Sequence, residues 1–278
     1  MRIDFHAHIT PPEIIANIEK IARKEKYFSL LSKSPNNKFA AAEDVVLSLK
    51  AESFDRAVIF GFAFKDLGLC ALVNDYVIEK TKQFPDRLIG FMSVSPNARG
   101  MEKEIERCFN AGLKGIGEIF PNGQGVNIDN EKETRALTNA CIERDIPLML
   151  HVNEPVGHYY TGKNNIPLQK IERFIHNSQG LKVILAHWGG GLFFYETMPE
   201  LRKKFRNVYY DTAATPFLYD ERIYRAAQAL GICEKILFGS DFPLLPQSRY
   251  LDALEKSGLT PQEKLQILGT NARKLLNL

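Results

Sequence analysis

Two histidines, His6 and His8, stand one residue apart in the apolar run "RIDFHAH" at the start of the chain. Side chains alternate along a β-strand, so residues two apart share one face. If this run is a strand, both imidazoles point the same way, and a bound metal ion is the simplest reason to hold them together. Taken alone the pair indicates little, since His-x-His also arises by chance.

Further residues that could ligate a metal stand at the ends of later apolar runs. These residues are Glu118 in "GIGEIF", His151 in "PLMLHV", His187 in "VILAH" and Asp241 in "ILFGSD". In a barrel of parallel strands the carboxyl ends meet at one face, where active sites are built. Buried acids at strand ends also need partners, and a divalent cation supplies one. The pattern therefore predicts a metal site.

The elements that must position these residues are eight short runs rich in β-branched and aromatic residues. Such runs, which do not alternate strictly, are typical of strands buried on both faces. The runs are 2–8, 56–63, 87–96, 114–121, 147–152, 182–190, 207–214 and 235–243. Helix-like stretches stand between them at 72–84, 101–112, 130–145 (capped by Asp129), 166–178, 221–231 and 260–276. This alternation predicts an α/β fold, a single (β/α)₈ TIM barrel over residues 1–278. An open doubly wound sheet is the alternative, because strand order is not visible in sequence.

The connection after the first strand, from about residue 10 to 42, is far longer than usual for α/β units. It contains an amphipathic stretch at 11–28 and a polar, loop-like stretch at 32–38. In a barrel this connection would lie over the face that carries the site. We expect it to be either a lid insertion or a plain surface elaboration.

Composition excludes several classes of function. Lys plus Arg outnumber Asp plus Glu by only 36 to 33, and the charges are interspersed, so no nucleic acid or anionic membrane is expected as a partner. No apolar run approaches membrane-spanning length, and the N-terminus lacks an apolar signal core. The four cysteines are widely spaced and are expected to be buried, reduced thiols. These features favour a cytoplasmic protein, with a homodimer expected only from general symmetry statistics.

The motifs "DFHAH", "LHVNEPVGH", "LAHWGGG", "FGSDFP" and "ILGTNARKLLNL" together resemble the amidohydrolase superfamily. Within it, the chain is similar to the amidohydrolase-2 branch of aminocarboxymuconate-semialdehyde decarboxylase-like hydrolases and decarboxylases, from residue 3 to residue 278. The resemblance implies that His6, His8, His151 and Asp241 bind a metal ion. It also implies that His187 contacts the attacking water or the substrate, and becomes a ligand where a second ion binds.

Glu118 departs from the commonest pattern of this superfamily. Members with two metal ions often carry a carboxylated lysine at the end of the fourth strand, whereas a glutamate there resembles the TatD-like deoxyribonucleases. A six-residue set including Glu118 could bridge two ions. We expect one ion, with Glu118 as a ligand or as a neighbour of the ligands; an ordinary salt-bridged acid is the alternative reading.

The predicted site implies a metal-dependent hydrolase that cleaves an amide, ester or lactone bond in a small, carboxylated substrate. We expect zinc, which brings the pKa of a bound water near neutrality, although nitrogen and oxygen ligands also accept manganese, iron or cobalt. Asp241 would act as the general base, and His187 would orient the water or polarise a carbonyl. The alternatives are a non-redox decarboxylase, a TatD-like phosphodiesterase and a ligand-binding barrel without turnover.

Two glycine-containing segments could be interpreted as sites that bind a phosphate or another anion. "GHYYTGKN", at 157–164, nearly matches a phosphate-binding loop but ends on Asn164 instead of a hydroxyl residue, and Pro167 follows where a helix should be under way. We therefore exclude nucleotide hydrolysis there. The glycines of "HWGGG" either present backbone N–H groups to an anion or let Trp188 pack closely. The candidates for substrate contact are His158, Tyr160, Lys163, Asp211 and Arg249.

Overall fold

The computed structural model describes residues 1–34, 38–163 and 166–278, and each of the eight predicted apolar runs contains a parallel strand. The strands are shorter than the runs because every run except the first continues into the loop that follows its strand. They are β1 (Ile3–His8), β2 (Arg56–Phe60), β3 (Leu88–Gly90), β4 (Ile116–Ile119), β5 (Leu148–Leu150), β6 (Val183–Leu185), β7 (Val208–Asp211) and β8 (Ile236–Leu237).

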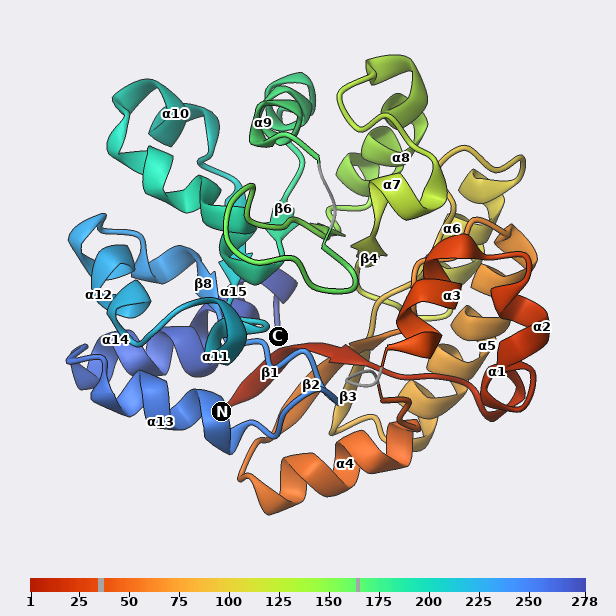
Figure 1. The fold of residues 1–278 in the computed structure, drawn as a ribbon, viewed down its shortest axis with the longest axis horizontal. Coiled ribbons are helices and arrows are strands. Elements are labelled where there is room, and N and C mark those ends of the chain that lie inside the picture. The colour runs from red at the N-terminus through yellow and green to blue at the C-terminus, as the bar shows by residue number, and fades with distance from the viewer. Residues whose placement is uncertain (35–37, 164–165) are drawn as a thin grey trace.

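The strands form two parallel sheets, ordered β1-β2-β3 and β4-β5-β6-β7-β8. Isolated parallel bridges join the two sheets at both edges, one between Met92 and Ile116 and one between Ala7 and Phe242. Backbone hydrogen bonds reinforce the second junction, since the Phe5 N–H donates to the Phe238 carbonyl at 2.6 Å. The chain is therefore a mixed α/β protein with parallel sheets, and Figure 1 shows the helices arranged around the strands.

The helices alternate with the strands, as the sequence predicts. They are α4 (Ala42–Ala51), α5 (Leu67–Gln83), α6 (Met101–Asn110), α7 (Pro121–Gln124), α8 (Glu131–Glu143), α9 (Leu168–Asn177), α10 (Pro199–Lys204), α11 (Thr215–Leu218), α12 (Arg222–Ala229), α13 (Ser248–Lys256), α14 (Pro261–Leu265) and α15 (Asn271–Leu276). Segments of 3₁₀ or π type span His187–Thr197, Cys233–Lys235 and Gln266–Thr270. In the described residues no helix is long and apolar enough to cross a membrane.

Both faces of the strands are buried, as their near-continuous apolar sequence predicts. In β2, Val58 and Phe60 belong to a cluster that also takes residues from β1, β3, β5, β6 and β8 and from α15. The alternate residues Ala57 and Ile59 belong to a second, larger cluster that packs the strands against the helices. The four cysteines are free and buried, as expected.

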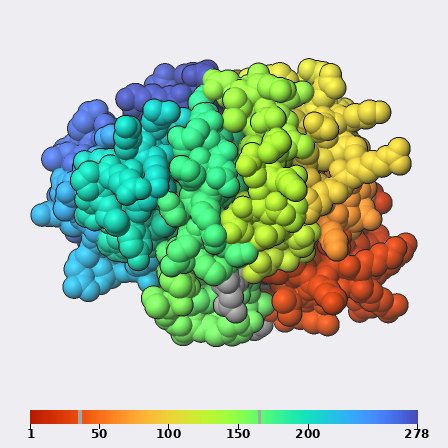
Figure 2. Space-filling view, turned by 90° about the horizontal axis from the view of Figure 1, so that it is seen from above, coloured from red at the N-terminus to blue at the C-terminus, as the bar shows by residue number. Residues whose placement is uncertain are grey.

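The connection after β1 contains the helices α1 (Pro12–Ala16), α2 (Ile18–Ala22) and α3 (Lys26–Lys33). Part of its predicted polar loop, residues 35–37, lies outside the described residues. The connection lies beside the loop that follows β5, because the Tyr27 hydroxyl donates to the Gly162 carbonyl at 3.2 Å. In Figure 2 these two segments, red and light green, lie along the same lower edge of the molecule.

Two details of the predicted helices are wrong. Asn130, and not Asp129, caps α8, because its side chain accepts a hydrogen bond from the Lys132 N–H. Asp129 instead forms ion pairs with Lys170 and Arg173 on α9. The single predicted helix 260–276 is divided by the non-helical Gly269, where a Cβ would lie 2.2 Å from a carbonyl oxygen at the N-terminus of the chain.

Candidate metal centre

The structure brings the six predicted residues together at the carboxyl ends of the strands. His6 and His8 belong to β1 and Glu118 to β4, while three residues lie just beyond their strands: His151 after β5, His187 after β6 and Asp241 after β8. Four of the six are buried, and only small fractions of the His8 and His151 side chains are exposed. Residues up to 235 positions apart in sequence, His6 and Asp241, thus lie in one buried polar cluster.

His6, His8 and Asp241 form the tightest group of potential ligands. The Nε2 atoms of His6 and His8 are 3.2 Å apart. Oδ1 of Asp241 lies 3.5 Å from Nε2 of His6 and 3.4 Å from Nε2 of His8. Two ligand atoms on one tetrahedral ion, each about 2.0–2.1 Å from it, are about 3.4 Å apart. The three atoms therefore have the spacing of one face of a coordination shell, so the residues present fit a divalent ion.

The remaining three residues adjoin this group. Oε1 of Glu118 lies 3.0 Å from Nδ1 of His151, and Oδ2 of Asp241 lies 3.6 Å from Nε2 of His187. His6, Glu118 and His187 also form a group with ligand atoms within 4.8 Å of one another. His151 stands slightly apart, because its Nε2 faces the side-chain oxygen of Asn153 at 3.0 Å.

Opposite charges stabilise one another in this cluster. Burial alone would lower the pKa of His6, but the adjacent Asp211 carboxylate raises it to about 9. Burial would likewise lower the pKa of His187, yet Asp241 and Glu118 raise it to about 10. Burial opposes ionisation of Glu118, but His151 brings its pKa to about 2. Glu118 is thus ionised and these two imidazoles are protonated at neutral pH, an arrangement in which a divalent cation can replace protons.

Metal uptake is therefore expected to release protons. A histidine must be neutral to bind a metal, and His6 carries its proton up to a pH of about 9. Adding zinc or manganese to the metal-free protein at pH 7.5 should release at least one proton per ion, followed with an indicator dye in weak buffer. The apparent affinity should rise about tenfold per pH unit for each proton released, and level off above the pKa of His6. Uptake without proton release would contradict this charge arrangement.

Two buried acids, Asp4 and Asp211, hold the potential ligands in place. Asp211 was predicted as a substrate contact, but it is fully buried behind His6, where it accepts from Nδ1 at 2.9 Å and from the His187 N–H at 2.9 Å. Asp4, which the sequence analysis did not select, accepts from the Ser240 N–H at 3.0 Å. It thereby ties β1 to the loop that carries Asp241. Asp4 could have been predicted from the sequence. It stands two residues before His6, so the alternation along a strand places both side chains on the same face.

The glycines of "HWGGG" are needed for the backbone conformation that positions His187. The chain is left-handed from His187 to Gly191, with φ between 56° and 85°. A Cβ at Gly190 would lie 2.3 Å from the Asn153 carbonyl oxygen. Trp188 is fully buried and donates from Nε1 to the Thr215 hydroxyl at 2.8 Å. Of the two readings of these glycines, this geometry supports close packing.

Alanine substitutions at Gly190 and at Gly191 should separate the cost of a left-handed backbone from the cost of a steric overlap. Alanine at either Gly190 or Gly191 meets a left-handed backbone, at a cost of about 1–2 kcal/mol. Only at Gly190 does the new Cβ overlap a backbone carbonyl, which should cost about 1–3 kcal/mol more. We expect Gly190→Ala to lower the denaturant midpoint clearly more than Gly191→Ala. Equal midpoints for the two variants would mean that the close approach to Asn153 is not a constraint.

The structure separates the remaining candidates for substrate contact. Tyr160 adjoins the cluster, because its hydroxyl accepts from the Asn153 side chain at 2.7 Å. Lys163 is used within its own loop, with Nζ donating to the Val156 carbonyl at 2.5 Å and to the His158 carbonyl at 3.1 Å. His158 is exposed on that loop, and Arg249 is exposed on α13. In the described part of the chain neither residue forms a hydrogen bond, an ion pair or a ring contact with the six clustered residues. Asn164, which decided the exclusion of a phosphate-binding loop, lies outside the described residues.

Aromatic side chains surround the cluster. Phe62 stacks on His8 with ring centroids 5.0 Å apart, and the edge of Phe120 meets His151 at 4.5 Å. Tyr27, from the connection after β1, stacks on Phe120 at 3.6 Å. These rings limit the access of water to the buried acids and histidines. A separate groove of about 600 Å³ lies away from the cluster, between α1, α2 and α5.

Comparison with known proteins identifies the family of the chain. The family model for amidohydrolases matches residues 3–278. A 5-carboxyvanillate decarboxylase from Sphingomonas paucimobilis is 14% identical with a TM-score of 0.81, over 100% of this chain and 99% of that one. The enzyme of the same name from Novosphingobium aromaticivorans, solved with manganese, is 18% identical with a TM-score of 0.79, over 100% and 96% of the two chains.

A third solved structure is of a protein named for a different activity. It is a probable 2-pyrone-4,6-dicarboxylic acid hydrolase from Acinetobacter baumannii, 16% identical with a TM-score of 0.69, over 100% of this chain and 99% of that one. At these identities the structures share the fold, whereas the family model covers nearly every residue of the chain. This protein therefore belongs to the amidohydrolase family.

Proposed function

We propose that this protein is a metal-dependent hydrolase of small molecules. His6, His8 and Asp241 would hold one divalent ion, with Glu118 and His151 completing its surroundings. The observation that carries the proposal is the triangle of His6, His8 and Asp241 ligand atoms, with edges of 3.2, 3.4 and 3.5 Å. Zinc suits these ligands, and manganese, which one structural relative contains, is the alternative ion.

The chain's own residues supply the remaining chemistry. A divalent ion at this site would act as a Lewis acid and lower the pKa of a coordinated water. Asp241 is ionised, because nearby His187 and His8 hold its pKa well below the usual range despite burial, so its carboxylate can accept a proton from water. His187 lies 3.6 Å from the second oxygen of Asp241 and can donate to a developing oxyanion. Asp211 keeps His6 oriented through Nδ1.

We further propose that residues 1–278 form one domain with a closed (β/α)₈ barrel. The parallel bridges between the segment after β3 and β4 and between β1 and the segment after β8 support closure. The apolar cluster shared by strands of both sheets supports it too. The connection of residues 10–42 would cover the mouth of the site, since Tyr27 stacks on Phe120 and bonds to Gly162.

Decarboxylation is the second candidate function, because two of the structural relatives are named as decarboxylases. The metal-loaded protein should be assayed against lactones, esters and amides, and against aromatic and enoic acids with detection of released carbon dioxide. We expect turnover of at least one hydrolytic substrate, abolished by a chelator and restored by added metal. Carbon dioxide release alone would assign the protein to the decarboxylases. Retained metal without turnover in either set would contradict both functions.

A further inference from the structure

The backbone that carries Asp241 has a conformation that its surroundings must hold. Asp241 is left-handed, with φ of 54°, and outside glycine this conformation persists only where neighbouring structure fixes it. On one side, the Phe242 carbonyl accepts from the His8 N–H at 2.8 Å, and the Phe242 N–H donates to Oγ of Ser240 at 3.2 Å. On the other side, the Ser240 carbonyl accepts from the Tyr250 hydroxyl. The position of the Asp241 carboxylate therefore depends on how firmly Ser240 and Phe242 are held.

Asp4 holds Ser240 with two further hydrogen bonds. Oδ1 of Asp4 accepts from the Ser240 N–H at 3.0 Å, and Oδ2 accepts from the Ser240 hydroxyl at 2.5 Å. Oδ1 also accepts from the His6 N–H at 3.2 Å within β1. Asp4 is fully buried, so its carboxylate depends on such donors in place of water.

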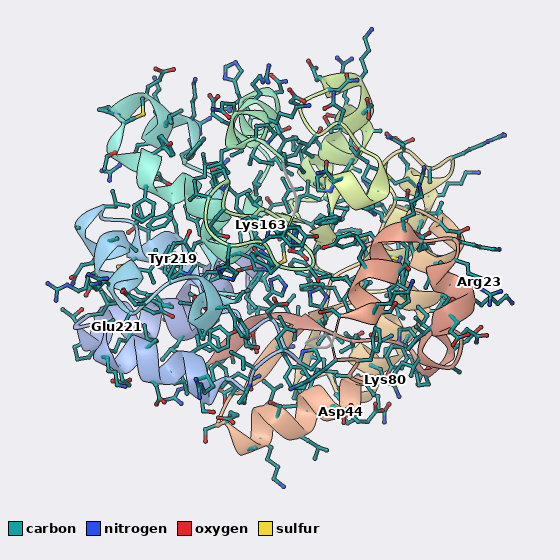
Figure 3. All side chains as sticks on the ribbon, in the orientation of Figure 1. Arg23, Asp44, Lys80, Lys163, Tyr219 and Glu221 are labelled. Atoms are coloured by element: carbon teal, nitrogen blue, oxygen red, sulfur yellow. The ribbon has the colours of Figure 1, made fainter. Side chains whose placement is uncertain are left out.

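Gln247 supplies one more donor to Asp4. It is fully buried immediately before α13, and its Nε2 donates to Oδ2 of Asp4 at 2.9 Å. Its Oε1 accepts from the Ser48 hydroxyl of α4 at 2.7 Å, so the amide is oriented with its NH₂ group towards Asp4. Figure 3 shows α4, on which Asp44 is labelled, at the lower edge of the molecule. A chain of hydrogen bonds thus runs from α4 at this edge to the residue that precedes Asp241.

We propose that Gln247 is a positioning residue of the metal centre. Through Asp4 and Ser240 it holds the Asp241 carboxylate beside the two β1 histidines, at the spacing that one ion requires. The inference rests on the proposed function, because it takes Asp241 to be a ligand of that ion. Ligands that are already in place bind an ion more tightly, since binding then imposes less new order. Gln247 thus contributes to metal affinity and coordination geometry without touching the ion.

Cobalt(II) can test this inference without a substrate, because nitrogen and oxygen ligands accept it and its visible absorption reports coordination geometry. The variant is Gln247→Met, which keeps the length of the side chain and removes both polar atoms. The dissociation constant should be measured calorimetrically, and the visible spectrum should be recorded at saturation. Asn74→Leu is the matched control. Asn74 is also fully buried, and its amide bonds to Ser93 and Glu104, neither of which is among the six clustered residues.

We expect Gln247→Met to raise the dissociation constant for cobalt(II) about 10- to 100-fold and to change the visible spectrum. Asn74→Leu should keep the wild-type dissociation constant and spectrum. Both variants should lower the denaturant midpoint, because each loses buried hydrogen bonds, so a loss of stability alone does not account for weaker metal binding. Wild-type affinity and spectrum in folded Gln247→Met, or an equal change in Asn74→Leu, would overturn the inference and leave the metal-dependent function standing.

Substitutions of Ser48 decide the question if Gln247→Met does not fold. Ser48→Ala removes the donor that orients the Gln247 amide, whereas Ser48→Thr keeps a hydroxyl group. We expect a smaller rise in the dissociation constant for Ser48→Ala and the wild-type value for Ser48→Thr. Equal affinities in Ser48→Ala and the wild type would overturn the inference. If the wild-type protein itself does not bind cobalt(II), the proposed function fails, and this inference fails with it.

Discussion

Replacing Asp241 by asparagine is expected to lower kcat/KM by about 10²–10⁴-fold on any substrate that the wild-type protein turns over. The carboxylate is the proposed proton acceptor, and its two oxygens face different partners. Oδ1 faces the Nε2 atoms of His6 and His8, and Oδ2 faces that of His187. Asparagine keeps the size and one acceptor oxygen but cannot take up a proton. The measurement is steady-state kinetics on the metal-loaded variant, with metal content determined on the same sample.

The control for this variant is Asp220→Asn. Asp220 is exposed and pairs with Arg222, so its loss should leave kcat/KM within about twofold and the denaturant midpoint unchanged. If fully metal-loaded Asp241→Asn kept more than about a tenth of the wild-type kcat/KM, Asp241 would not be the general base. His187 would then be the next residue to test, because it is the nearest other titratable group on that side.

Replacing His6 by alanine is expected to raise the dissociation constant for the metal ion by more than about 100-fold. His6 belongs to both groups of potential ligands among the described residues, so neither group keeps three ligands without it. The variant also leaves Asp211 buried without its imidazole partner, which should destabilise the protein by about 3–5 kcal/mol. The measurements are metal titration by calorimetry and unfolding in denaturant with and without metal.

Two further variants make the interpretation of His6→Ala specific. His176→Ala removes an exposed histidine of α9 and should leave metal affinity unchanged. Asp211→Asn keeps every potential ligand but alters the group that orients His6, which should cost about 10- to 100-fold in affinity. If His6→Ala bound metal as tightly as His176→Ala, the ion would have to lie elsewhere.

Much of the site could be predicted because its residues stand at recognisable places in the sequence. Apolar runs predict buried strands, and the ends of parallel strands meet at one face, so six residues separated along the chain could be assigned to one cluster. The alternation within β1 places His6 and His8 together, and in the structure their Nε2 atoms are 3.2 Å apart.

Other features depend on contacts that no local pattern encodes. Asp211 ends a strand like the other predicted residues, and only the approach of β7 to β1 shows that it lies behind His6. Lys163 looked available for substrate, but its loop folds back and directs Nζ to backbone carbonyls.

The most direct test of the metal centre is elemental analysis of the purified wild-type protein, before and after incubation with zinc or manganese. We expect about one transition-metal ion per chain, removed by chelation and retained in Glu118→Ala. About two ions, falling to one in Glu118→Ala, would change the proposal to a two-metal site that includes Glu118 and His187. No bound transition metal in any preparation, even after reconstitution, would contradict the metal centre and the hydrolase proposed on it.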